Sequence, residues 1–182
     1  MVVAFVATGA IAQEQGKIRG GANIGWCIPK GGGGVCFDLQ AGYNLSDDMT
    51  VGIKWGYALM GKVDPKGEVG SIVGNSNLLG TFTYFLNMGS FAPFVGAGAG
   101  LYTVAGGGTG LTGFVIEPGN KFGGMLTAGF EFKRFRLGLE YNLIPSSDAH
   151  LVSVVGPQYG SVKNSYMALT FGFYLGGGKR AQ

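Results

Sequence analysis

The sequence predicts an all-β protein: an eight-stranded antiparallel up-and-down transmembrane β-barrel. Three observations predict it. Apolar and polar residues alternate along eight segments of roughly ten residues, the links between the segments are alternately short and long, and charged residues are scarce. Charged residues make up 13% of the 182 residues and hydrophobic residues 46%, whereas soluble domains contain about 25% charged residues. The length suits a single domain.

Each segment gathers its apolar residues on one face, because successive side chains of a strand point to opposite faces. In the segment 35–45, Phe37 and Leu39 share one face while Asp38 and Gln40 share the other. A strand of about ten residues crosses a bilayer when it is tilted. In chain order, the apolar faces are Ile18, Ala22, Ile24 and Trp26; Phe37 to Leu45; Val51 to Leu59; Leu78 to Leu86; Val95 to Leu101; Phe122 to Phe132; Phe135 to Leu143; and Met167 to Leu175.

The links between these segments alternate in length. Short links are expected at 46–49, 87–90 and Lys133-Arg134, and long ones at 28–35, 60–75, 104–120 and 144–164. Outer-membrane barrels have short turns on the periplasmic side and long loops outside the cell. The pattern therefore predicts four long extracellular loops.

Aromatic residues on the apolar faces gather towards the two ends of the segments. Membrane barrels carry such aromatic girdles where their outer surface meets the two interfaces of the bilayer. The residues assigned to these girdles are Trp26, Phe37, Tyr43, Tyr57, Phe91, Phe132, Phe135 and Phe173.

The opposite face of each segment is polar or glycine and is predicted to line the lumen. Side chains can fill the interior of an eight-stranded barrel. We therefore expect a packed, charge-balanced polar network and not a wide channel. Its members are predicted to be Arg19, Asp38, Gln40, Lys54, Glu131, Arg136 and Glu140.

The N-terminal stretch and the two cysteines both indicate export. Residues 1–12, "MVVAFVATGAIA", are apolar and end in an A-x-A pattern, as at the end of a secretory signal peptide. They lack a basic start, so the signal is predicted to be truncated at its N-terminus. The barrel domain then comprises 13–182. An apolar first strand or a disordered end is the alternative for 1–12.

Cys27 and Cys36 are the only cysteines. In an exported protein such a pair favours a disulfide. We predict that the two residues face each other across the first hairpin and close its loop. Two unpaired, inward-facing cysteines are the alternative.

Other chemistry finds little support in the sequence. The glycine runs at 31–34 and 106–108 lack the G-K-[ST] sequence of a phosphate-binding loop. The basic residues are scattered and the net charge is +3, which argues against a nucleic-acid partner. His150 follows Ser146, Ser147 and Asp148, but these are ordinary loop residues. We predict no enzyme activity, no cofactor and no metal site.

The A-x-A stretch, the eight alternating segments, "PFVGAGAGLYT" (93–103) and "MALTFGFYL" (167–175) resemble small outer-membrane β-barrel proteins of the class of OmpX and the OmpA transmembrane domain. The resemblance covers 16–176. It implies residence in a Gram-negative outer membrane with lipid and lipopolysaccharide as neighbours, and insertion by the barrel-assembly machinery.

The expected protein is therefore a monomeric outer-membrane barrel with a structural role in the envelope or a role in surface adhesion or interaction through its extracellular loops. Two alternatives stay open on the sequence. One is a secreted, soluble, lipocalin-like barrel that binds an apolar ligand, which would need the Phe and Leu face turned inwards. The other is a narrow pore.

Overall fold

The computed structural model describes residues 14–63, 69–86, 91–108, 113–153 and 156–177. The predicted signal peptide (1–12) and the predicted short link 87–90 lie outside these residues. Within the described ranges, no helix has the length and hydropathy needed to cross a membrane.

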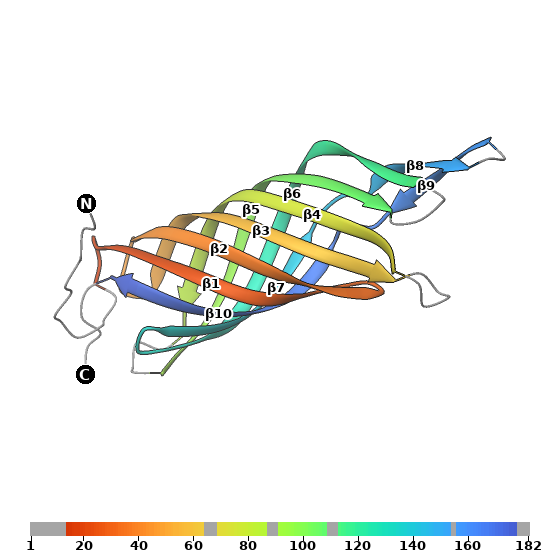
Figure 1. The fold of residues 1–182 in the computed structure, drawn as a ribbon. Helices are drawn as coiled ribbons and strands as arrows, with labels where there is room; N and C mark the ends of the chain where they lie inside the picture. The colour runs from red at the N-terminus through yellow and green to blue at the C-terminus, as the bar shows by residue number, and fades with distance from the viewer. Residues whose placement is uncertain (1–13, 64–68, 87–90, 109–112, 154–155, 178–182) are drawn as a thin grey trace, which may run out of the picture.

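Eight antiparallel strands close into a barrel (Figure 1). Each strand pairs with the next, β5 pairs with β6, and β10 returns to pair with β1. The predicted fold class is therefore confirmed. The barrel strands are β1 (Ile18–Pro29), β2 (Gly32–Asn44), β3 (Met49–Val63), β4 (Val69–Phe85), β5 (Phe91–Gly108), β6 (Gly113–Phe132), β7 (Phe135–Leu143) and β10 (Tyr166–Gly176).

Two further strands occupy the predicted fourth long link. Strands β8 (Ser147–Ser153) and β9 (Gly156–Val162) form an antiparallel hairpin. Residues 150–152 of β8 pair with 113–115 of β6. Strands β4, β5 and β6 are also long, with 17, 18 and 20 residues. Figure 1 shows these strands and the hairpin projecting together from one end of the barrel.

The first link differs from its prediction as a long loop at 28–35. Strand β1 continues to Pro29 and β2 begins at Gly32, so only Lys30 and Gly31 form the turn. Gly31 adopts φ +77°, which glycine reaches without the steric penalty of a Cβ atom. The predicted short links at 46–49 and Lys133-Arg134 are tight turns in the structure.

The outer surface of the barrel is apolar. Ile24, Leu78 and Leu169 are exposed by 64%, 55% and 50%, and the apolar faces predicted for all eight segments point outwards. The soluble alternative requires the same side chains to converge on the barrel axis. The structure therefore excludes a lipocalin-like interior.

The interior contains two apolar clusters as well as polar residues. The larger cluster lies towards the projecting end and includes Met60, Leu79, Tyr102, Met125 and Tyr166. The smaller cluster, Phe85, Ala92 and Phe94, lies at the short-turn end. We call them the apolar plug and the lower aromatic cluster. The prediction of a polar lumen was therefore wrong for these two levels, because it assigned only polar residues and glycines to the interior.

Candidate functional site in the barrel lumen

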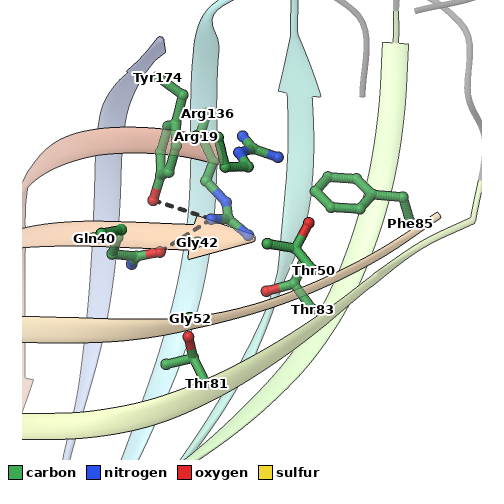
Figure 2. Close-up of a pocket in the computed structure, with 11 residues that line it drawn as sticks. Arg19, Gln40, Gly42, Thr50, Gly52, Thr81, Thr83, Phe85, Arg136 and Tyr174 are labelled. Carbon is green, nitrogen blue, oxygen red and sulfur yellow. Dashed lines mark hydrogen bonds between the residues drawn. The ribbon is translucent and has the colours of Figure 1, made fainter. Parts of the chain in front are cut away.

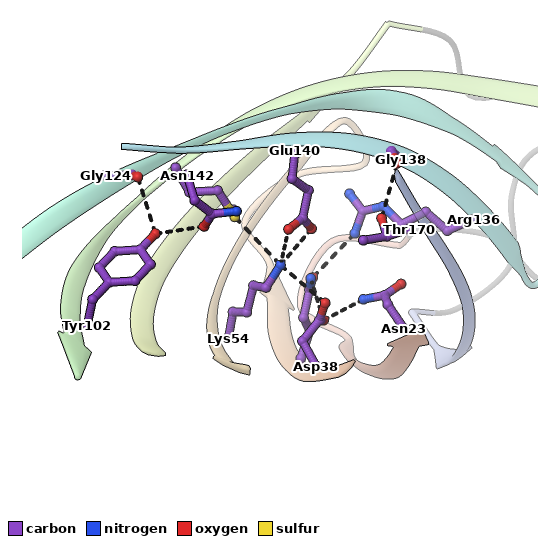
Figure 3. Close-up of polar contacts among 12 residues, drawn as sticks. Asn23, Asp38, Lys54, Tyr102, Gly124, Arg136, Gly138, Glu140, Asn142 and Thr170 are labelled. Atoms are coloured by element: carbon purple, nitrogen blue, oxygen red, sulfur yellow. Dashed lines mark hydrogen bonds and ion pairs between the residues drawn. The ribbon is translucent and has the colours of Figure 1, made fainter. Parts of the chain in front are cut away.

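Lys54 of β3 lies in the centre of the lumen and contacts two carboxylates (Figure 3). Its Nζ atom lies 2.6 Å from both Oε atoms of Glu140 on β7 and 3.2 Å from Oδ2 of Asp38 on β2. Lys54 is only 2% exposed. Removing a charged group from water costs several kcal/mol, and close opposite charges and hydrogen bonds offset that cost.

A second ionic group lies nearer the short-turn end. Arg19 Nη2 of β1 lies 2.7 Å from Glu131 Oε1 of β6, and Arg136 Nε of β7 lies 3.6 Å from the same oxygen. Together with Lys54, Asp38 and Glu140, the buried ion pairs in the described residues join three cations to three carboxylates. The lumen therefore neutralises its own charge.

Neutral polar side chains connect these two ionic groups. Asp38 Oδ1 accepts hydrogen bonds from Asn23 Nδ2 at 2.5 Å and from Gln40 Nε2 at 3.1 Å. Arg136 Nη1 donates to Tyr174 Oη at 3.0 Å and to Gln40 Oε1 at 3.4 Å. Asn23 also donates to Tyr174 Oη at 3.1 Å. The network therefore joins six of the eight barrel strands: β1, β2, β3, β6, β7 and β10.

Glycines flank the charged residues along the inward rows of the strands. Side chains at i and i+2 point to the same face of a strand, so Lys54 shares its inward row with Gly52 and Gly56. Gly138 stands in the same way between Arg136 and Glu140. A Cβ atom on Gly52 would lie 2.4 Å from the carbonyl oxygen of Ala41, a distance that real contacts do not allow.

The arginine side chains also pack on aromatic rings. The guanidinium carbon of Arg136 lies 3.8 Å from the ring centroid of Phe94, and that of Arg19 lies 4.8 Å from Tyr174. Such contacts stabilise a desolvated cation by about 2 kcal/mol or more. The ionic network is therefore in direct contact with the lower aromatic cluster through Arg136 and Phe94.

The apolar plug covers the ionic level on its other side. Lys54 Nζ lies 3.6 Å from Met125 Sδ, where the two levels meet. Tyr102 is fully buried and donates to Asn142 Oδ1 at 2.9 Å. Cavities of about 20 and 10 Å³ lie at the ionic level, and a space of about 10–15 Å³ is needed for one water. Side chains therefore fill the lumen at three successive levels.

The structure brings all seven predicted lumen residues into this one network. Sequence reasoning did not assign Tyr174 or the apolar plug to the lumen. The signal was present, because Tyr174 has the inward parity of Thr170 and Gly172, and Tyr102 that of Gly98 and Gly100. The structure places the eight predicted girdle aromatics on the outer surface. Four of them are successive register partners across β5, β6, β7 and β10: Phe91, Phe132, Phe135 and Phe173.

The predicted pairing of the cysteines is wrong in register. Cys27 lies opposite Gly34, and Cys36 lies opposite Gly25, because the two-residue turn fixes a pairing two residues away from the predicted one. The cysteines are diagonal neighbours, for which Cα atoms lie about 7–8 Å apart, whereas disulfides span about 4.4–6.8 Å. Both are free thiols in the structure, so the predicted disulfide is absent from it.

No protein-family model matches the chain, and no curated protein matches it in sequence. Solved structures do match in fold. The outer membrane protein OprG from Pseudomonas aeruginosa gives a TM-score of 0.54 at 10% identity, over 90% of this chain and 98% of that one. The chain has the fold of a small outer-membrane β-barrel.

Two further structures show the same likeness. Neisserial surface protein A (NspA) gives a TM-score of 0.52 at 14% identity, over 87% of this chain and 95% of that one. A major outer membrane protein from Thermus thermophilus gives 0.50 at 14% identity, over 89% and 100%. These likenesses establish the fold. Together with the apolar outer surface, they support the predicted localisation to the bacterial outer membrane.

Proposed function

We propose that this chain is a closed outer-membrane anchor that presents a β-sheet at the cell surface, with a structural role in the envelope or a role in surface interaction and no enzyme activity. The filled lumen is the observation that carries this proposal. The neutral ionic network occupies the centre of the barrel, with the apolar plug on one side and the lower aromatic cluster on the other. An ion would have to displace side chains at all three levels.

The projecting end of the barrel supports the surface role. Strands β4 to β6 continue well past the level at which β7 ends, and the β8–β9 hairpin pairs with β6 beyond that level. Binding residues concentrate on surface segments held by a rigid scaffold. His150 and Asp148 lie on β8, and their side chains are outside the described part of the structure.

The setting follows from the outer surface. A barrel with an apolar belt and its short turns in the periplasm is placed by the barrel-assembly machinery in a membrane of phospholipid and lipopolysaccharide. Among the described strands, the closed circle of eight leaves no unpaired barrel edge for strand exchange. We propose that the chain works as a monomer in that membrane.

Planar-bilayer recordings of the refolded protein test the closed lumen. We expect no stable conductance steps from the wild type. The triple variant Tyr102→Ala/Arg136→Ala/Phe94→Ala removes one large side chain at each of the three levels and is the positive control, for which we expect intermittent openings. Regular conductance steps from the wild type would support a narrow pore and overturn the proposal of a closed anchor.

Labelling of intact cells tests the orientation. Ser153→Cys places a thiol on β8 at the projecting end, and Asp47→Cys places one at an exposed short turn. A membrane-impermeant maleimide should label the first variant in intact cells and the second only after the outer membrane is opened. The reverse pattern would contradict a surface role for β8 and β9.

A further inference from the structure

The larger lumen cavity, of about 20 Å³, has an unusual balance of charge (Figure 2). Among the described residues, two guanidinium groups line it, those of Arg19 and Arg136, and no carboxylate does. The acid that both arginines share, Glu131, is not part of the lining. The remaining polar lining comes from Gln40, from Tyr174 and from the threonines 50, 81 and 83.

Both arginines are more than nine-tenths buried, at 7% exposure each. In Figure 2 the guanidinium of Arg136 extends from Tyr174 and Gln40 towards Thr50, and that of Arg19 lies beside it, near Phe85. Cations held in a space of low dielectric attract an anion more strongly than cations in water do. The hydroxyl of Thr50 already donates to Asn44 Oδ1 at 2.9 Å, whereas the hydroxyls of Thr81 and Thr83 can donate hydrogen bonds into the cavity.

The volume limits what the cavity can hold. One water needs about 10–15 Å³ measured in the same way, so the cavity of about 20 Å³ accommodates a single particle only slightly larger than water. From the cationic lining and this size, we propose that the cavity binds one monatomic anion of the chloride class, held by Arg19, Arg136 and the hydroxyls of Thr81 and Thr83. This site is independent of the proposed surface role.

A crystal of the wild-type protein grown in sodium bromide tests the site directly, because bromide substitutes for chloride and scatters anomalously. We expect an anomalous peak in the cavity between Arg19 and Arg136. A peak-free cavity occupied by a water would overturn the proposal.

The rate of unfolding in solution shows whether the anion also binds at ordinary salt concentrations or only at the high concentration in the crystal. The unfolding half-life of the wild type in detergent should be at least about threefold longer in sodium chloride than in sodium gluconate of equal ionic strength, since a ligand that binds only the folded state stabilises it in proportion to its occupancy. Equal half-lives would overturn the proposal even if bromide is seen in the crystal.

Two threonine variants localise the effect. Thr83→Val removes a hydroxyl that lines both cavities, and Thr127→Val removes one that lines the second cavity only. We expect the chloride effect to shrink in the first variant and persist in the second. If chloride lengthened the unfolding half-life equally in both variants, it would bind elsewhere on the protein, and the proposed site would be overturned.

Discussion

Lys54 and Glu140 face each other across the full width of the barrel, with Nζ 2.6 Å from both carboxylate oxygens. Their strands, β3 and β7, lie four steps apart in the closed order of eight, on opposite walls. The ion pair therefore connects walls that share no backbone hydrogen bonds. This buried ion pair therefore holds two opposite walls of the barrel together.

Removing the cation of this pair should destabilise the barrel strongly. Lys54→Met leaves Asp38 and Glu140 buried without their shared cation, and we expect a loss of about 3–5 kcal/mol in the free energy of unfolding. Urea unfolding of the refolded protein measures it. The exposed Lys17→Met is the matched control and should change stability by less than about 0.5 kcal/mol. Equal effects in both would contradict a stabilising role for the network.

Neutralising the stranded carboxylates should recover part of that loss. The triple variant Lys54→Met/Asp38→Asn/Glu140→Gln contains no unpaired charge at this position, so it should be more stable than Lys54→Met alone. The same urea titration compares them. A triple variant less stable than the single one would show that hydrogen bonding, and not unpaired charge, dominates.

Close strand contact should make Gly100 intolerant of substitution. A Cβ atom there would lie 2.2 Å from the carbonyl oxygen of Leu78 on the neighbouring strand. The backbone would have to move to relieve this clash, and we expect the movement to cost about 1–3 kcal/mol of folding free energy. At Gly80, on the outer face, the nearest atom is 3.9 Å away. Gly100→Ala should reduce the heat-modifiable folded fraction on gels, whereas Gly80→Ala should not.

The thiols should stay unpaired in the folded protein. Cys27 is fully buried and lies opposite Gly34, not Cys36; the Cα atoms of such diagonal neighbours are in general about 7–8 Å apart, which is beyond the usual span of a disulfide. We expect the same gel mobility with and without reductant, and maleimide labelling of two thiols only after unfolding. A reductant-dependent mobility shift would restore the disulfide and require the β1–β2 register to move by two residues.

Charge placed on the outer surface should be costly in a depth-dependent way. Leu139 lies in the middle of β7, and Ile18 lies at the rim end of β1. An arginine costs about 2–4 kcal/mol at the centre of a bilayer and about 0–1 kcal/mol near its interfaces. Unfolding from lipid vesicles should therefore show Leu139→Arg to be much less stable than Ile18→Arg, and equal losses would contradict a lipid-facing surface.

The alternation of the sequence predicted which way side chains point, because that period depends only on local chain geometry. Phe37 is outside and Asp38 inside for this reason. The register was not predictable in the same way, since Cys27 pairs with Gly34 only because two residues, Lys30 and Gly31, complete the turn. A shift of two residues preserves every face, so alternation cannot detect it.

Contacts across the lumen were equally hidden. Lys54 and Glu140 are 86 residues apart, and their common level depends on the registers of all the strands between them. The apolar plug was missed for another reason. Met60 and Tyr102 alternate in step with the inward-facing residues. Apolar residues in a membrane barrel usually face lipid, so their residue type did not indicate that they lie in the lumen.

The two tryptophans provide the most direct test of the central claim that the apolar face meets lipid. Trp26 and Trp55 are both on the outer surface, exposed by 56% and 55%; Trp55 lies mid-strand in β3 and Trp26 close to the end of β1. In vesicles containing lipids brominated near the bilayer centre, single-tryptophan variants (Trp26→Phe or Trp55→Phe) should both be quenched, more strongly where Trp55 is the one retained. Fluorescence that the brominated lipids leave unchanged in both variants would contradict the account.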